Sequence, residues 1–164
     1  MNRFWILSLS IPLFLSCSKK NNFIPDKCEN FQSPETTESR VMVTQGVYGI
    51  ISFTQGNCMP GGSLGLCFTC PVERSIRFYE YTKMGYAVSD EAGGGFFKNF
   101  RTRLIGEVAS DIHGFYQISL PPGTYTMAVV ENGKLYSNSF DGQGGIYPVT
   151  VGAGKLKTDF NINY

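Results

Sequence analysis

The stretch that decides the fold is residues 111–140, DIHGFYQISLPPGTYTMAVVENGKLYSNSF, in which short apolar and aromatic runs alternate with turn residues. These runs predict three strands, at residues 115–120, 124–131 and 134–140. Asn132-Gly133 separates the last two, and both residues tolerate the positive φ that a type I′ hairpin turn requires. The stretch therefore predicts antiparallel strands joined by tight turns.

The same pattern continues on both sides of this stretch. Further strands are predicted at residues 47–55, 75–82, 103–110, 146–151 and 155–164. The last of these alternates apolar with polar residues, which predicts one buried and one solvated face. Pro148 cannot donate a ladder hydrogen bond, so its strand is expected at a sheet edge or at a bulge. Two long loops, at residues 56–71 and 84–100, are expected between the strands.

Composition agrees with an all-β protein of one domain. Nineteen Gly, eight Pro, nine Tyr and thirteen Phe favour strands and tight turns. A chain of 164 residues has room for one domain. We therefore expect an antiparallel seven-stranded β-sandwich at residues 45–164, of immunoglobulin-like or transthyretin-like size. The formal net charge is +1, so no basic field is available for nucleic acid, and none is expected as a partner.

A longer motif in this region resembles that of a known family. It reads Asp111-x-x-Gly114-x-Tyr116-x-Ile118-x-Leu120-Pro121-x-Gly123-x-Tyr125, after a first strand containing Gly46-Val47-Tyr48-Gly49. The motif is similar to that of the carboxypeptidase regulatory-like domain of the transthyretin-like group, over residues 46–164. The resemblance implies a β-sandwich with turns at Gly114 and Gly123 and a corner held by the Tyr125 hydroxyl. Family members accompany zinc carboxypeptidases, begin outer-membrane receptors or stand alone as lipoproteins, and this chain resembles the last kind.

The N-terminus has the pattern of a bacterial lipoprotein signal peptide. Arg3 precedes an apolar stretch at residues 4–15, shorter than the roughly 20 residues of a transmembrane helix. The sequence LFLSC, ending at Cys17, resembles a lipobox. Residues 1–16 are thus expected to be removed and Cys17 to be lipidated; an ordinary secretory peptide or a short membrane anchor is the alternative. Residues 17–44 are polar and are expected to form a flexible tether.

The residues after Cys17 indicate where the lipid anchor is held. Ser18 resembles the residue that directs lipoproteins to the outer membrane, and Lys19 and Lys20 favour the periplasm-facing side. The expected location is therefore the bacterial envelope, with the outer membrane as partner through the N-terminal lipid. Two or more acyl chains give durable attachment, where a single chain does not.

Four further cysteines, Cys28, Cys58, Cys67 and Cys70, are the expected disulfide candidates of an exported chain. The favoured pairing joins Cys58 to Cys67 or Cys70 and leaves the other for Cys28. A zinc site made of the four thiolates is an alternative, although only Cys67 and Cys70 have the C-x-x-C spacing. A redox motif is the other alternative, but no helix is predicted after Cys70 to lower a thiol pKa.

Nothing in the sequence assembles a catalytic set. His113 is the only histidine and lies in a predicted turn, so neither a nucleophile–base pair nor a zinc peptidase centre is expected there. Asp90, Glu91 and Asp141 lie in Gly-rich loops without the regular spacing of a calcium loop, which indicates turn formers. The protein is expected not to be an enzyme and to need no metal or cofactor.

The expected function is that of a non-catalytic binding domain. Tyr86, Phe96 and Phe97 lie in the predicted loop at residues 84–100 and form a binding surface if they are exposed, or part of the core if they are buried. The expected partner is an envelope protein or a glycan. The alternatives are a purely structural envelope spacer and a cysteine-based redox or zinc protein.

Overall fold

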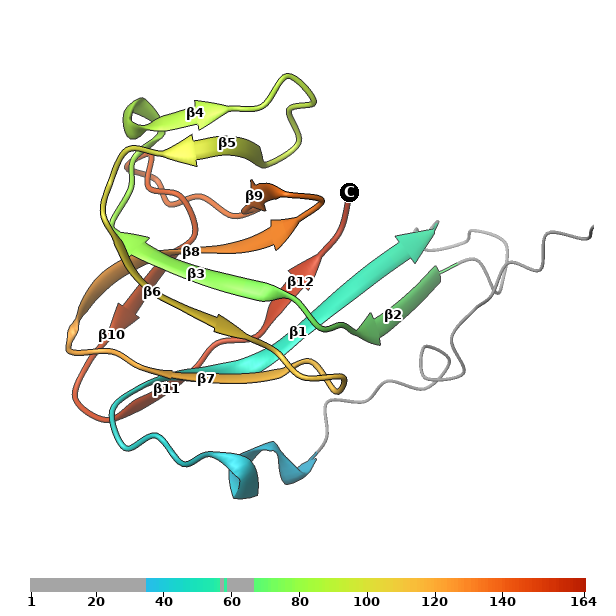
Figure 1. Ribbon diagram of the computed structural model, residues 1–164, viewed down its shortest axis with the longest axis vertical. Coiled ribbons are helices and arrows are strands. Elements are labelled where there is room, and N and C mark those ends of the chain that lie inside the picture. Colours follow the sequence, from blue (N-terminus) through green and yellow to red (C-terminus); the bar gives the residue numbers. More distant parts are fainter. Residues whose placement is uncertain (1–34, 57, 59–66) are drawn as a thin grey trace, which may run out of the picture.

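The chain forms a two-sheet all-β domain in a computed structural model that describes residues 35–56, 58 and 67–164 (Figure 1). The described strands are β1 (Gly46–Gly56), β2 (Cys67–Pro71), β3 (Ser75–Glu80), β4 (Ala87–Ser89), β5 (Phe96–Phe100), β6 (Leu104–Ala109), β7 (Phe115–Ser119), β8 (Gly123–Glu131), β9 (Lys134–Tyr136), β10 (Pro148–Val151), β11 (Lys155–Lys157) and β12 (Phe160–Ile162). Two short 3₁₀ helices are η1 (Glu35–Arg40) and η2 (Met84–Tyr86). The predicted signal peptide, Cys17 and Cys28 lie outside the described residues. No helix in the described part is long and apolar enough to cross a membrane.

The first sheet is built around β1, which is hydrogen-bonded along both of its edges. Its first half pairs antiparallel with β7 and parallel with β11, and its second half pairs antiparallel with β2 and parallel with β12. Opposite Gly49, the parallel partner of β1 changes from β11 to β12. A Cβ atom on Gly49 would overlap the carbonyl group of Thr158. At this point the Asp159 carboxylate, rather than a backbone carbonyl, accepts the Ile50 N–H, at 2.9 Å.

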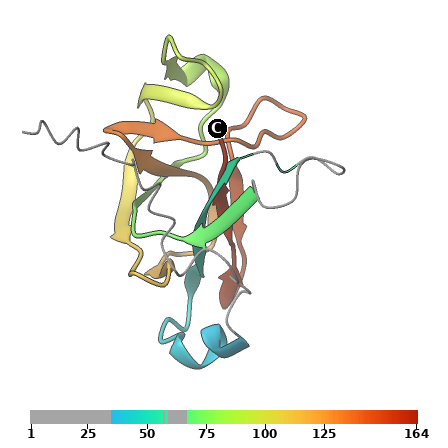
Figure 2. The same cartoon turned by 90° about the vertical axis from the view of Figure 1, so that its right-hand side faces the viewer.

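The second sheet has seven strands in the order β4-β5-β9-β8-β3-β6, with β10 also paired to β8. The β8–β9 hairpin turns at Asn132 and Gly133, whose φ values of 52° and 76° confirm the predicted type I′ turn. Pro148 is the first residue of β10, and β10 pairs with β8 alone among the described strands. The predicted edge position of this strand is therefore confirmed. Figure 2 shows the two sheets from the side.

The all-β sandwich is confirmed, but the predicted count of seven strands is not. The described part has twelve strands, because the two predicted loops contain β2, β4 and β5. The predicted strand at residues 155–164 is divided into β11 and β12, and both run parallel to β1. An alternating pattern defines which face of a strand is buried, but it does not define the neighbouring strand or its direction.

The main hydrophobic core lies between the sheets. Both sheets contribute to it, with Val47 and Phe160 from the first and Phe78 and Met127 from the second, each fully buried. Truncating one of the large core side chains to alanine typically costs about 3–5 kcal/mol. A second cluster covers other residues of the seven-stranded sheet, where the Phe100 ring meets Tyr79 at a centroid distance of 5.1 Å.

The turn before β7 is built by two residues of the family-like motif. One carboxylate oxygen of Asp111 accepts the N–H groups of His113 at 2.8 Å and Phe115 at 3.0 Å. Gly114 has a φ of 72°, and its carbonyl accepts the Ile51 N–H at 2.8 Å. A Cβ atom on Gly114 would overlap the Ile51 carbonyl oxygen, so only glycine fits between this turn and β1.

Two further residues of the motif, Gly123 and Tyr125, form a corner at the start of β8. The Tyr125 hydroxyl donates to the Pro121 carbonyl at 2.8 Å, four residues upstream. Gly123 begins β8, and a Cβ atom there would lie 3.2 Å from that hydroxyl. This hydrogen bond therefore holds the corner. It has room to form because Gly123 has no side chain.

Residues from η1 onward, which fall within the range predicted as a tether, pack on the domain. Arg40 forms an ion pair with Asp111, and its guanidinium lies 4.3 Å from the centroid of the Phe115 ring. Glu38 accepts the Tyr48 hydroxyl at 2.8 Å, and Val41 packs on a small cluster that includes Tyr48 and Phe115. These contacts cover the part of the first sheet around Tyr48 and Phe115. Apolar periodicity alone does not predict this cover.

Replacing Gly114 with alanine is expected to destabilise the domain much more than the same change at Gly133. Both glycines have positive φ, but nothing lies within 4 Å of a Cβ atom on Gly133. We expect Gly133→Ala to lower the free energy of unfolding by about 1 kcal/mol, and Gly114→Ala by about 3 kcal/mol or more. Denaturant unfolding measures both, and equal losses would contradict the close approach of Gly114 to β1.

Candidate functional site

The predicted aromatic surface is not a single exposed site. Phe97 is 2% exposed and belongs to the second hydrophobic cluster, so of the two alternatives it takes the core position and not the binding surface. Phe96 is half-buried, and its ring contacts Tyr136 and Tyr164 at centroid distances of 4.9 Å. Tyr86 is 60% exposed and is the one member that faces solvent. The reason is that β5 pairs with β9 instead of forming a loop.

Two of the four disulfide candidates, Cys67 and Cys70, lie on β2, whereas Cys28 is outside the described residues. Cys58 is exposed. Cys67 and Cys70 both belong to β2, where their register partners on β1 are Gly56 and Phe53. Residues three apart on a strand have Cα atoms separated by about 10 Å, beyond the roughly 7 Å that a disulfide can bridge. The C-x-x-C segment therefore cannot form the local disulfide of a redox motif in this conformation.

The remaining titratable residues singled out in the sequence serve turns. His113 is exposed in the turn before β7. Asp90 accepts the Ala92 N–H at 3.0 Å and pairs with Lys134 at 2.7 Å, and Glu91 pairs with Lys98 at 2.9 Å. Among the described residues, no group of three or more His, Cys, Asp or Glu side chains is placed to hold a metal ion.

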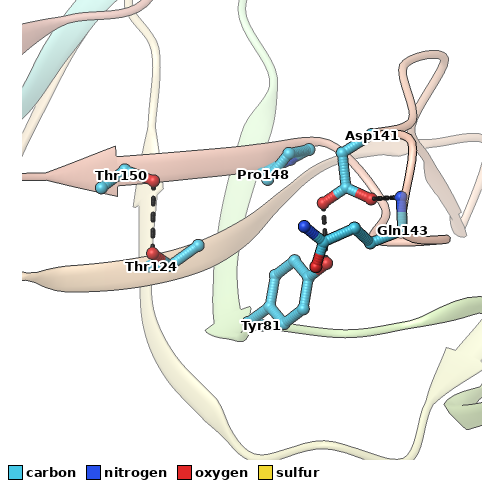
Figure 3. A pocket seen from close by; sticks show the side chains of 6 residues that line it. All are labelled: Tyr81, Thr124, Asp141, Gln143, Pro148 and Thr150. Atoms are coloured by element: carbon cyan, nitrogen blue, oxygen red, sulfur yellow. Dashed lines mark hydrogen bonds between the residues drawn. The ribbon is translucent and has the colours of Figure 1, made fainter.

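A polar groove lies beside the end of β3, between the start of β8, β10 and the corner at residues 141–145. Its volume is about 420 Å³, within the usual range of small-molecule sites. Figure 3 shows the six residues that line it, which are Tyr81, Thr124, Asp141, Gln143, Pro148 and Thr150. These residues are up to 69 positions apart in sequence, and the pairing of β10 with β8 brings them together.

Asp141 organises this groove. Its Oδ1 atom accepts the N–H groups of Gln143 at 2.8 Å and Gly145 at 2.7 Å, which shapes the corner. Its Oδ2 atom accepts the Tyr81 hydroxyl at 2.7 Å, which joins the corner to the end of β3. A Cβ atom on Gly145 would overlap both the Tyr81 hydroxyl and the Asp141 carboxylate, so this arrangement requires glycine there.

These contacts also set the protonation states of the groove. The hydrogen bond from Tyr81 is the largest cause that lowers the pKa of Asp141, and Lys83 makes a smaller contribution. The same hydrogen bond raises the pKa of Tyr81. At neutral pH the groove therefore holds an ionised carboxylate and a protonated phenol.

The other lining groups add hydrogen-bonding capacity without charge. The hydroxyls of Thr124 and Thr150 lie 3.2 Å apart on the exposed face of the β8–β10 pair. The side-chain amide of Gln143 has no hydrogen-bond partner within the described part of the chain. Lys83 lies near the groove, with its Nζ atom 6.0 Å from the centroid of the Tyr81 ring. The arrangement is suited to binding a polar ligand through several neutral donors and acceptors and one carboxylate.

The sequence did not predict this groove. Its position in a Gly-rich loop predicts that Asp141 forms a turn, and it does. Its second carboxylate oxygen, however, accepts a hydrogen bond from Tyr81, 60 residues away. The only available signal was the spacing of Asp141 and Gln143 within a Gly-rich corner. That spacing predicts an Asx turn and carries no information about Tyr81.

No protein-family model, no curated protein and no solved structure matches this chain.

Replacing Tyr81 with phenylalanine is expected to raise the pKa of Asp141 toward its ordinary value of 3.8, because the hydroxyl is the main group that lowers it. A carboxyl whose pKa is lowered by folding stabilises the protein above its unfolded-state pKa, and this contribution is lost as the pH falls through its folded-state pKa. The variant should therefore lose less stability between pH 5 and pH 2 than the parent.

Carboxyl-carbon NMR titration measures this shift directly. Asp90 provides an internal control, because Lys134 is the main group that lowers its pKa and is unchanged in the variant. An unchanged Asp141 titration in Tyr81→Phe would contradict the assigned hydrogen bond.

Proposed function

We propose that this chain is a lipid-anchored protein of the bacterial envelope whose β-sandwich binds a ligand in the polar groove without transforming it. The observation that carries the binding role is the Asp141 network, which holds a carboxylate in three hydrogen bonds at the wall of a hollow. Side chains held in place before binding lose little conformational entropy when a ligand arrives, and this favours recognition.

The lipid anchor is proposed from the LFLSC sequence that ends at Cys17 and from the polar residues after it. The contacts of Arg40 and Glu38 hold η1 on the domain, at the end of the proposed link to the anchor. In Figure 1, η1 lies at the lower end of the domain, and the chain enters β1 from there. The ends of β3 and β10, beside which the groove lies, are on the left side of the same view.

The resemblance to the carboxypeptidase regulatory-like domains is part of this proposal. It is supported by the Gly114 turn against β1 and by the hydroxyl of Tyr125 on the Pro121 carbonyl. A free-standing lipoprotein of this family, periplasm-facing at the outer membrane, is the form that we propose. Its proposed partner is a glycan or another envelope protein.

Two alternatives lead to different experiments. A structural spacer is favoured by the docking of η1, which fixes the domain close to its tether. A redox or zinc protein would use Cys67 and Cys70, and their separation along β2 opposes it. We propose that the cysteines instead form two disulfides, joining Cys58 to Cys67 or Cys70 and Cys28 to the other. Loss of envelope integrity on deletion, without any detectable ligand, would favour the spacer.

Replacing Cys17 with alanine is expected to abolish lipidation and to release the protein from the membrane fraction. The parent protein should show a mass increase corresponding to its acyl chains, and this increase should be absent in the variant. Intact mass of protein purified from its native envelope measures this, together with thiol labelling before and after reduction. Four labels should appear only after reduction. An unmodified Cys17 in the parent would contradict the anchor, and stoichiometric zinc would contradict the disulfides.

A further inference from the structure

We propose that the polar groove binds a neutral saccharide. This inference rests on the binding role proposed above and specifies its ligand class. It starts from the hydrogen-bonding capacity that the lining side chains keep after their contacts within the protein are counted.

The groove offers acceptors and donors side by side. Asp141 uses about three of the roughly four lone-pair positions of a carboxylate, which leaves one on Oδ2. The Tyr81 hydroxyl donates its proton to Asp141, so its oxygen can only accept from a ligand. The Gln143 amide keeps its carbonyl and both of its N–H groups. A sugar hydroxyl both donates and accepts, so a row of hydroxyls can satisfy this mixture.

The geometry of the opposite wall is consistent with the same ligand class. Thr124 and Thr150 bond to each other, and only one of the two hydroxyl protons is used in that bond. The second proton and the remaining lone pairs stay available on this exposed pair of side chains. Pro148 adds a rigid apolar surface between them and the corner, and this is suited to the C–H face of a sugar ring.

The charges of the groove favour a neutral ligand over an anionic one. Asp141 is ionised at neutral pH and would repel a phosphate, sulfate or uronate group bound against it. Lys83 lies beside the Tyr81 ring, and one lysine beside one carboxylate leaves no net positive charge. A peptide or protein partner would need a broad contact surface of several hundred Å² on each side, whereas this site is a small polar hollow.

The test uses the full mature lipoprotein in detergent micelles. It is applied to an array of neutral oligomers of glucose, mannose, galactose and N-acetylglucosamine, with sulfated and uronate oligosaccharides alongside. Calorimetric titration then measures the affinity of the strongest neutral oligomer. Gln143→Ala and Thr150→Val should each weaken it roughly three- to tenfold, the usual effect of losing one neutral hydrogen bond. Asn99→Ala, an exposed change on β5 outside the groove, should leave it unchanged.

The outcomes separate the proposal from the binding role on which it rests. Neutral binding that the groove variants weaken supports the proposal. Neutral binding that neither variant changes would overturn the location, and binding of anionic oligosaccharides alone would overturn the ligand class. Capture of an envelope protein that Gln143→Ala weakens, with no sugar bound, would overturn the saccharide and retain the binding role. No ligand of any kind would overturn both.

Discussion

The hydrogen bonding of β1 (Gly46–Gly56) along both edges is the constraint on which the rest of the structure depends. Four strands use it as their partner, and two of them come from the end of the chain. The exchange of β11 for β12 works only because Gly49 admits the Thr158 carbonyl and Asp159 supplies the missing acceptor for Ile50. A side chain at position 49 would separate the strands here. The main core would then lose the packing of the side chains that β1 and β12 contribute to it.

Sequence patterns predicted the local structure well wherever the chemistry is local. The Asn132-Gly133 turn and the edge position of Pro148 follow from backbone conformations and donors that those residues themselves possess. Pairing over long distances was not predictable in the same way. The alternation at residues 155–164 indicates a buried face, yet it is equally consistent with parallel and antiparallel neighbours. The three glycines before Phe96 indicate a loop, although Phe96 and Phe97 begin β5 of the second sheet, where Phe96 packs on the main core and Phe97 on the second cluster.

The groove shows the same division between local and distant information. Asp141 and Gln143 form an Asx turn that a sequence can indicate, because both partners lie within a few residues. The hydrogen bond from Tyr81 depends on where β3 ends relative to this corner, and Thr150 meets Thr124 only through the register of β10 on β8. A site assembled from three distant segments cannot be recognised from the spacing of its residues along the sequence. Its residues also resemble ordinary turn and surface residues.

The proposed anchor and the proposed ligand class together account for why a small groove would be sufficient. A few neutral hydrogen bonds in an open polar hollow give a modest affinity, because each replaces a bond to water. Attachment to a membrane changes this, since many copies held on one surface bind a repeating glycan at high effective concentration. The chain between Cys17 and η1 spans at most about 60 Å when extended, so neighbouring domains could reach successive units of one polymer. The ion pair of Arg40 with Asp111 fixes η1 on the domain, so this reach is counted only as far as η1.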